Sequence, residues 1–208
     1  MGDFEYYERD GKQYERVTRI LDYFAPPELV SWKVRVGNKE ANRVSKVALK
    51  FGSRVHELIE TDGKVVSKDG EEVRNCIKAY ESWKSDNGNP ELTNGATLFC
   101  DKRGIAGTPD AVMGETLIDF KTSREVKAVH FTQLGAYASL MKVTPKILAI
   151  LRLDKQSGIY EWVTNEKIGM TVYACIQAFN YMLGYYRFNN CVQSTLKPNR
   201  ATPEGEEV

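Results

Sequence analysis

The chain has 208 residues, of which 42% are hydrophobic and 27% charged, with 29 lysines and arginines against 28 aspartates and glutamates. This length and apolar fraction suit a folded protein with its own core and exclude a disordered chain. No apolar run approaches the roughly 18–20 residues that span a bilayer, and the charged first residues predict no signal peptide. The net charge of +1, taken alone, disfavours a nucleic-acid partner.

The cysteines and the tail bear on compartment and domain organisation. Four cysteines stand far apart without a C-x-x-C pair, which predicts a reducing, cytoplasmic compartment rather than a zinc or disulfide framework. No repeat or low-complexity tract divides the chain, so we expect one domain over residues 1–195. Its N-terminal part, about 1–90, is expected to be helical, and a sheet with helices is expected over about 91–195. Residues 196–208 are predicted to form a flexible acidic tail.

The N-terminal part has the periodicity of helices. Helices are predicted over residues 17–24, from residue 28 onward, after residue 38, and over 71–83. In the third of these, apolar residues recur at three- and four-residue steps and predict a stripe that faces a core, namely Val44, Ala48, Phe51, Val55 and Leu58. Gly52 lies in the middle of this helix, where glycine costs ~1 kcal/mol relative to alanine. We therefore expect a structural reason for glycine at this position, such as the close approach of another backbone.

From residue 97 the periodicity becomes that of strands. Strands are predicted over 97–102, 104–112, 116–121, 146–153 and 159–163, and helices over 130–141 and 168–188. The aromatic residues at helical spacing in the last helix are predicted to pack in a core, and they are Tyr181, Tyr185, Tyr186 and Phe188. The order of elements predicts an α/β (α+β) fold with a central mixed β-sheet flanked by helices.

The most informative stretch surrounds residues 107–122. Asp119 and Lys121 share one face of a predicted strand, and Asp110 at the end of the preceding strand should return close beside Asp119. Two neighbouring carboxylates repel unless a cation lies between them, and oxygen ligands suit Mg²⁺ or Mn²⁺. A lysine beside them would steer water and neutralise charge on a phosphate. The alternative is a surface hairpin with a salt bridge, because the acidic-x-Lys pattern occurs four times in the chain.

Two other pairs of residues stand at helical spacing. His56 lies four residues after Gly52 and four before Glu60, so the three line one face, although a lone histidine on a helix is more often structural. Gln133 and Tyr137 lie side by side one turn apart, within reach of a phosphate or of Lys121. The alternative for that pair is a solvated glutamine and a core tyrosine.

Together, these residues occur in the order of a known superfamily. The sequence resembles the PD-(D/E)XK nucleases, and within them the RecB-like exonuclease group. The family motifs Gly-x-x-x-His, Gly-x-x-Asp, Asp-x-Lys and Gln-x-x-x-Tyr are matched in turn by Gly52–His56, Gly107–Asp110, Asp119–Lys121 and Gln133–Tyr137. The resemblance implies a restriction-endonuclease-like core with a helical N-terminal extension.

The resemblance also implies roles for the matched residues. A divalent Mg²⁺ or Mn²⁺ would be held by His56, Asp110, Asp119 and the backbone carbonyl of Phe120. Lys121 would orient or activate the attacking water, and Gln133 and Tyr137 would position the DNA strand or Lys121. Some relatives carry an iron–sulfur cluster on one cysteine before the histidine motif and three after the tyrosine motif. Here no cysteine precedes His56 and two follow Tyr137, so no cluster is expected.

A basic segment precedes His56. Residues 33–54 contain seven lysines and arginines against one glutamate, a net charge of +6 that leaves −5 on the rest of the chain. The predicted DNA contacts within it are Lys39, Arg43, Lys46, Lys50 and Arg54. The alternative is a solvated helix face. The net charge of +1 is therefore the sum of a basic segment and an acidic remainder, and it does not exclude a nucleic-acid partner.

These features favour a metal-dependent DNA exonuclease acting on single strands or duplex ends, in recombination, repair or replication in a bacterial or phage-infected cell. One alternative of the same superfamily is a structure-specific endonuclease, such as a junction resolvase or a restriction-type enzyme. Another, from a different class, is a catalytically silent nucleic-acid-binding module. The Gln-x-x-x-Tyr motif favours the exonuclease, and the intact Asp–Asp–Lys set disfavours the silent module. DNA, as a single strand or a duplex end, is the expected partner, no membrane association is expected, and the sequence does not indicate which proteins, if any, the chain binds.

Overall fold

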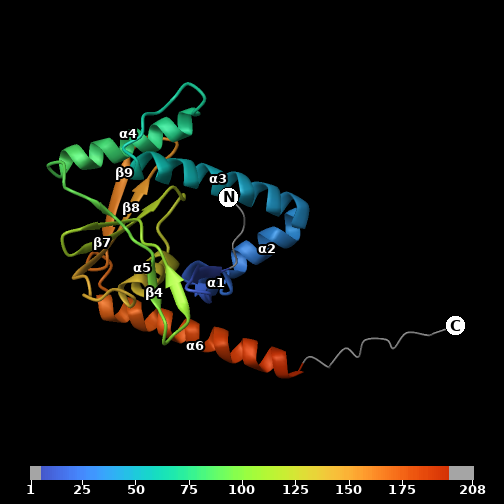
Figure 1. Ribbon diagram of the computed structural model, residues 1–208. Coiled ribbons are helices and arrows are strands. Elements are labelled where there is room, and N and C mark those ends of the chain that lie inside the picture. The colour runs from blue at the N-terminus through green and yellow to red at the C-terminus, as the bar shows by residue number, and fades with distance from the viewer. Residues whose placement is uncertain (1–5, 197–208) are drawn as a thin grey trace.

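The computed structural model describes residues 6–196, so the predicted tail lies outside the described residues except for Leu196. Within this range the chain forms a mixed α/β fold with two mixed sheets and six helices (Figure 1). The predicted fold class is confirmed, but the predicted single central sheet is replaced by two sheets. No helix in the described range is long and apolar enough to cross a membrane.

The larger sheet has five strands in the order β3-β6-β7-β8-β9. Its strands are β3 (Thr93–Asn94), β6 (Ala111–Met113), β7 (Thr116–Lys121), β8 (Ile147–Leu153) and β9 (Tyr160–Thr164). Strands β7 and β8 pair in parallel, and the other neighbours pair antiparallel. Residues 116–120 of β7 are all buried because helices cover both faces of this sheet.

The smaller sheet has four strands in the order β1-β2-β5-β4. Its strands are β1 (Tyr6–Arg9), β2 (Lys12–Arg16), β4 (Leu98–Cys100) and β5 (Ile105–Gly107). Strands β1 and β2 form a hairpin whose two turn residues, Asp10 and Gly11, both have positive φ, as a tight hairpin turn with right-handed strand twist requires. The prediction of helix for the N-terminal part is therefore wrong for residues 6–16.

The predicted strand over residues 104–112 is wrong in one respect. It is divided into β5 and β6, which belong to different sheets. Pro109 lies at the break, and proline has no backbone N–H to donate to a ladder. The chain therefore leaves the smaller sheet at Gly107 and enters the larger one at Ala111, with Asp110 in the connection rather than at the end of a strand.

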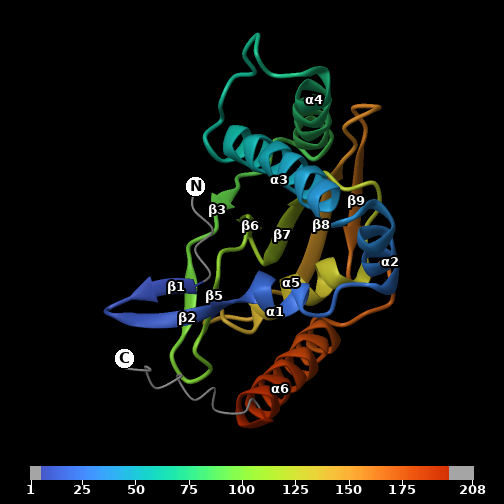
Figure 2. The ribbon, with the colours of Figure 1, turned by 90° about the vertical axis from the view of Figure 1, so that its right-hand side faces the viewer.

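Helices cover both faces of the larger sheet (Figure 2). The helices of the described range are α1 (Val17–Asp22), α2 (Pro27–Val36), α3 (Asn38–Glu60), α4 (Glu71–Asp86), α5 (Ala128–Ala138) and α6 (Val172–Leu196), and α2 contributes no residue to either core. Helices α3 and α4 contribute Val55 and Trp83 to a core with Phe120. Helices α1, α5 and α6 form a second core on the opposite face, around Leu117 and Leu134.

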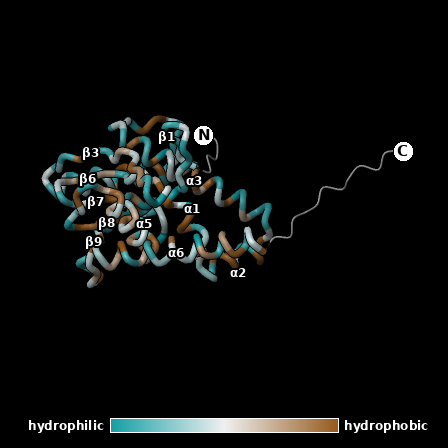
Figure 3. The backbone as a smooth tube through the Cα atoms, turned by 60° about the horizontal axis from the view of Figure 1, so that its bottom comes forward, coloured by the Kyte–Doolittle hydropathy of each residue, from teal (hydrophilic) through white to brown (hydrophobic). Residues whose placement is uncertain are grey.

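The first half of α3 and all of α2 extend beyond the sheets (Figure 3). Helix α2 has no buried residue, and Ala41 is the one buried residue in the first half of α3. Of the predicted apolar stripe, Val55 and Leu58 are buried, Phe51 is half-buried, and Val44 and Ala48 are exposed. The stripe prediction is thus wrong for the half that no layer covers. The same holds for α6, where Tyr186 is buried but Tyr181, Tyr185 and Phe188 are exposed.

Candidate metal and nucleic-acid site

The site lies at the C-terminal end of β7, where Asp119, Phe120 and Lys121 follow one another. Side chains alternate along a strand, so Phe120 packs into the α3–α4 core while Asp119 and Lys121 face the other side. The pairing of Ala111 with Ile118 brings Asp110, the next residue outward, beside Asp119. The sheet thus brings together both carboxylates and the lysine of the sequence motifs.

His56 reaches this strand end from α3. Its Nε2 donates to the Phe120 carbonyl oxygen at 3.2 Å, and its Nδ1 lies 3.4 Å from Asp110 Oδ1. Asp110 Oδ2 in turn accepts a hydrogen bond from the Phe120 backbone N–H at 2.7 Å. Burial disfavours a charged imidazole, but the hydrogen bond and charge of Asp110 outweigh it, and the pKa of His56 is raised. His56, Asp110 and Phe120 therefore form one contact group.

Asp119 is almost fully buried, at 1% exposure. Its Oδ2 lies 2.7 Å from Lys121 Nζ, yet neither carboxylate oxygen accepts a well-formed hydrogen bond within residues 6–196. Burial raises the pKa of Asp119, with a further increase from Asp110, against the opposing charges of Lys121 and His56. Lys121 is thus the close cationic neighbour of this buried carboxylate, and a bound metal cation would be a further way to compensate its burial.

The donors around this strand end fit a hard divalent cation in kind. Two carboxylates and a backbone carbonyl supply oxygens, and His56 supplies a ring nitrogen. Nowhere in the described part of the chain, however, do three His, Cys, Asp or Glu side chains already stand close enough to hold a metal ion. Asp119 is turned to Lys121 and Asp110 is bonded to Phe120, so these contacts must rearrange for the full set to act together.

Helix α5 holds Lys121 from its other side. Lys121 Nζ donates to Gln133 Oε1 at 3.1 Å, and Gln133 Nε2 donates to the Tyr137 hydroxyl at 2.9 Å. Tyr137 is buried at 3% exposure, and burial raises its pKa, so the phenol stays protonated at neutral pH. The structure thus joins Gln133 and Tyr137 to Lys121 in one hydrogen-bonded chain.

Two glycines of the matched motifs have different surroundings. A Cβ at Gly107 would lie 2.5 Å from Tyr137 Cε1, so the close approach of the ring requires glycine there. A Cβ at Gly52 would meet Thr122 Oγ1 at 3.9 Å and no closer atom. The expected close approach of another backbone to Gly52 is therefore wrong, and the helix leaves room on that side.

The basic residues of α3 divide into two groups. Arg43 pairs with Glu40, and Arg54 pairs with Glu57 and with the buried Asp69, whose pKa Arg54 lowers to about 2. The other three are exposed, with no ion pair in the described range, namely Lys39, Lys46 and Lys50. At about 100° per helical residue, these lysines lie roughly 80–120° around α3 from His56. The structure therefore offers three lysines to a ligand and places Arg54 in a structural ion pair.

The motifs did not identify His130, which caps the start of α5 and lies near enough to Lys121 for that charge to affect its pKa. It precedes Gln133 by three residues on the same face of α5, and its Nδ1 accepts the backbone N–H of Lys127 at 3.2 Å. Burial lowers the pKa of His130 to about 4, helped by Lys121 and Lys127. The available signal was its spacing: the chain has two histidines, and this one stands one turn before Gln133.

No protein-family model and no curated protein matches the chain. Among solved structures, the chain is similar to one described as the crystal structure of SSO0001, with a TM-score of 0.40, 16% identity, and 94% of this chain and 89% of that chain covered. It is also similar to the alkaline exonuclease LHK-Exo from Laribacter hongkongensis, with a TM-score of 0.34, 13% identity, and 88% of this chain and 94% of that chain covered. A third similar structure is a phage-related exonuclease from Haemophilus somnus 129PT, with a TM-score of 0.32, 15% identity, and 69% of this chain and 82% of that chain covered.

Proposed function

We propose that the chain is a metal-dependent deoxyribonuclease that removes nucleotides from the ends of DNA, single-stranded or duplex, in recombination, repair or replication. The observation that carries the proposal is the group at the end of β7. There Lys121 Nζ lies 2.7 Å from the buried carboxylate of Asp119, and Asp110, His56 and the Phe120 carbonyl lie nearby. A purely structural salt bridge at the end of a strand would need neither the second carboxylate nor the histidine.

The residues that would hold Mg²⁺ or Mn²⁺ are Asp110, Asp119, His56 and the carbonyl of Phe120. A divalent ion bound there would polarise a phosphate oxygen and lower the pKa of a coordinated water. For His56 and both carboxylates to bind the metal together, the proton between His56 and Asp110 would have to leave. Asp119 would also have to turn away from Lys121.

Lys121 would then act on the substrate. Its ammonium remains bonded to Gln133 Oε1, and Gln133 is fixed by the Tyr137 hydroxyl. This chain of contacts limits the directions that Lys121 can take, so its charge would be directed at the phosphate oxygens as negative charge develops on them. Tyr137 and Gln133 are therefore positioning residues for Lys121.

The free lysines of α3 supply contacts to the DNA backbone. Lys39, Lys46 and Lys50 carry charges that no acidic side chain in the described residues neutralises. Each such lysine can replace a counterion on a phosphate, which makes binding dependent on salt. Because these lysines lie to one side of His56 on α3, they would contact phosphates away from the cleaved bond rather than the bond itself.

The test is digestion of 5′- and 3′-labelled linear strands, duplexes and covalently closed circles in Mg²⁺, Mn²⁺ or EDTA. The proposal expects nucleotides from linear DNA with either metal, no product in EDTA, and intact closed circles. Asp119→Asn and Lys121→Ala should abolish release, whereas Glu115→Gln, at an exposed ion pair with Lys146, should not. Cutting of closed circles would show an endonuclease instead. DNA binding without release of nucleotides in either metal would show a silent binding module.

A further inference from the structure

The outer side of α6 is uncharged and exposed, although the opposite side of the same helix already packs in a core. The buried side chains of α6 belong to the core shared with α1 and α5, and they are Cys175, Phe179, Leu183 and Tyr186. Roughly 150° around the helix stand seven residues at alternating steps of four and three. This outer stripe consists of Ala174, Ala178, Tyr181, Tyr185, Phe188, Val192 and Thr195, all exposed except the half-buried Val192. A helix that is apolar on both sides is usually buried on both sides.

Three aromatic rings make up most of the surface of the outer stripe. Tyr181, Tyr185 and Phe188 are 77%, 56% and 66% exposed, on a part of α6 that extends beyond the sheets (Figure 1). An aromatic side chain has about 150–250 Å² of surface, so the three rings expose about 300–500 Å² per chain. Tyr23 of α1 adjoins them, with its ring centroid 6.4 Å from that of Tyr185. An apolar patch of this size is among the largest on an ordinary monomer and is often an interaction site.

Gly184 lies beside these rings, one turn from both Tyr181 and Phe188. Glycine in the interior of a helix is less favourable than alanine, so its presence needs a reason. At Gly135 the reason lies within the chain, because a Cβ there would clash with the backbone of Cys175. A Cβ at Gly184 would have no atom within 4 Å, so no neighbour in the described part of the chain requires glycine. The bare backbone at Gly184 would instead let a partner approach the helix closely.

The charge of α6 indicates which kind of partner fits. Arg187 is the one charged residue among the 25 of the helix, and its guanidinium donates to the carbonyl oxygen of Arg103. A single strand of nucleic acid would need cations beside the rings for its phosphates. A charged partner protein would find no complementary charges on the stripe. Two copies of α6, in contrast, can face each other without opposing like charges.

A second copy also fits the spacing of the outer stripe. In a two-fold symmetric contact the same patch is present on both copies. Alternating steps of four and three read nearly the same from either end, so two antiparallel helices can bring their stripes together about a point between Gly184 and Tyr185. The facing pairs are then Ala174 with Thr195, Ala178 with Val192, and Tyr181 with Phe188. Small residues thus meet larger ones, whereas in a parallel pair the alanines would face each other and leave a gap.

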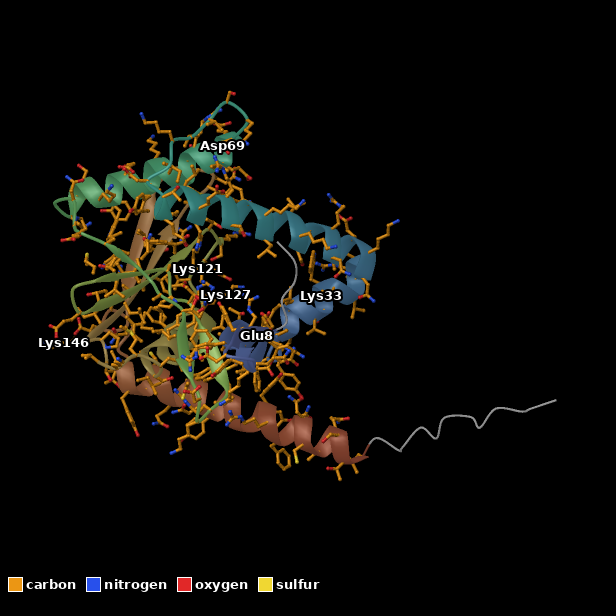
Figure 4. The ribbon with its side chains drawn as sticks, viewed as in Figure 1. Glu8, Lys33, Asp69, Lys121, Lys127 and Lys146 are labelled. Atoms are coloured by element: carbon orange, nitrogen blue, oxygen red, sulfur yellow. The ribbon has the colours of Figure 1, made fainter. Side chains whose placement is uncertain are left out.

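We propose that the chain forms a homodimer in which the outer stripes of two α6 helices pack antiparallel. The rings of both copies would bury about 600–1,000 Å² in total, near the lower limit for a specific interface, so the dimer should be in equilibrium with the monomer. This inference goes beyond the proposed nuclease function, because no residue of the site at β7 lies on α6. In Figure 4, α6 runs along the lower edge of the molecule, whereas Lys121 is labelled near its centre.

Sedimentation velocity of the full chain over about a hundredfold range of concentration measures this equilibrium. The wild type should shift from the mass of one chain toward that of two. Tyr181→Glu should raise the Kd of the dimer about tenfold or more, because the charge enters the contact from both copies. The matched control is Ile159→Glu, which adds the same charge at a 66% exposed side chain between β8 and β9 and should keep the wild-type Kd. A wild type that stays monomeric, or equal Kd values for the two variants, would overturn the proposal.

Gly184→Ala is a variant for which the monomer and the dimer should respond in opposite directions. The new Cβ has open space within the chain, so the Tm of the dilute, monomeric protein should rise. The same Cβ would hold the two helices apart, so the Kd of the dimer should rise several-fold. A higher Tm with an unchanged Kd would contradict the close contact at Gly184.

Disulfide formation between copies tests the orientation of the helices. Cys191 is the exposed cysteine of the chain, and in the antiparallel pair the two Cys191 residues would stand about 20 Å apart along the helices. Oxidation should therefore leave the wild-type dimer without a disulfide. Tyr185→Cys in a Cys191→Ser background places a cysteine near the two-fold axis, where it should link to its own copy. A Cys191 disulfide in the wild type would show a parallel pair and overturn the antiparallel one.

Stacking of single-stranded DNA on the rings is the alternative that binding measurements separate. Fluorescence anisotropy of a labelled strand in EDTA is measured at a protein concentration where the chain is monomeric. The homodimer proposal expects Tyr181→Glu to bind the strand as Ile159→Glu does. Weaker binding of the strand by Tyr181→Glu, with the Kd of the dimer unchanged, would assign the rings to DNA and overturn the homodimer.

Discussion

Replacing Gly107 with alanine tests whether the buried ring of Tyr137 fixes the position of Lys121. The new Cβ would lie 2.5 Å from Tyr137 Cε1 and 3.2 Å from Val17 Cγ2, whereas ordinary contacts begin at 3.4 Å. The ring would have to move by the difference of about 0.9 Å. Tyr137 and Val17 are 3% and 1% exposed, so the ring has no solvent to move into. Overpacking of this kind costs about 1–3 kcal/mol of unfolding free energy.

The displacement should also reach Lys121. The Tyr137 hydroxyl accepts from Gln133 at 2.9 Å, and Gln133 accepts from Lys121 at 3.1 Å, so a shift of the ring stretches or breaks both contacts. A misplacement of about 1 Å in catalytic machinery costs on the order of 100-fold in rate. Gly107→Ala should therefore lose about that factor in nucleotide release under conditions where the variant is still folded.

Urea unfolding followed by circular dichroism gives the stability, and release of label from linear DNA gives the activity. Gly52→Ala is the matched control for stability, since its Cβ meets Thr122 Oγ1 at 3.9 Å and no closer atom. That variant should be more stable than the wild type by about 0.5–1 kcal/mol, the usual gain within a helix. Tyr137→Phe keeps the ring and should lose activity without overpacking. A Gly107→Ala protein that is destabilised but fully active would refute the link from Tyr137 to Lys121.

Three further predictions concern stability and DNA binding. Below pH 6.5 the unfolded chain protonates His130 while the folded protein, with a pKa of about 4, does not. Urea titrations should therefore show the unfolding free energy of the wild type falling by about 2 kcal/mol relative to His130→Asn between pH 6.5 and 4. Arg54 lowers the pKa of Asp69 from 3.8 to about 2, so the stability that the wild type holds over Asp69→Asn at pH 7 should vanish as the pH falls through 2, as thermal melts would show. Replacing Lys46 and Lys50 with glutamine should lower the salt slope of single-strand binding by about 1.4, and an unchanged slope would favour a merely solvated helix face.

The parts of the fold that the sequence predicts well are those with local causes. Strand β7 follows from the alternation over residues 116–121, and α4 follows from the apolar spacing over 71–83, close to the observed Glu71–Asp86. The motif residues also meet as expected, because alternation on β7 and one-turn spacing on α5 fix which side chains share a face. Local periodicity therefore carries most of the candidate site.

Contacts between distant segments were not predictable in the same way. Besides Glu57, Arg54 pairs with Asp69, fifteen residues away in a loop, and nothing in the charge pattern of residues 33–54 indicates this second partner. Hydropathy likewise indicates that a side chain favours burial, but the side chain is buried only where another helix or a sheet packs over it. Val44 has the same apolar character as Val55, but only Val55 faces α4 and the sheet. The division of residues 104–112 between two sheets occurs at Pro109, although the segments on either side of it, 105–107 and 111–112, both have the pattern of a strand.

The charges of the site are paired with one another, and this suggests how its ligands would bind. Asp119 is paired with Lys121 and Asp110 with His56, so each carboxylate has a cation within the protein. A divalent ion on the carboxylates would displace Lys121 and the His56 proton, and the freed Lys121 would then be available to a phosphate. Metal and phosphate should therefore strengthen each other's binding, and by linkage the factor is the same in both directions.

Calorimetric titration of Mn²⁺ with and without inorganic phosphate measures this coupling directly. In the wild type, phosphate should lower the Kd for Mn²⁺ about five- to tenfold, which is the lower part of the range typical of coupled sites. Lys121→Met should bind Mn²⁺ more tightly than the wild type in the absence of phosphate, because Asp119 no longer has a competing cation, and most of the coupling should be lost. Tighter binding by the variant with the coupling intact would mean that groups other than Lys121 hold the phosphate. Weaker Mn²⁺ binding by the variant would mean that Lys121 does not compete for Asp119.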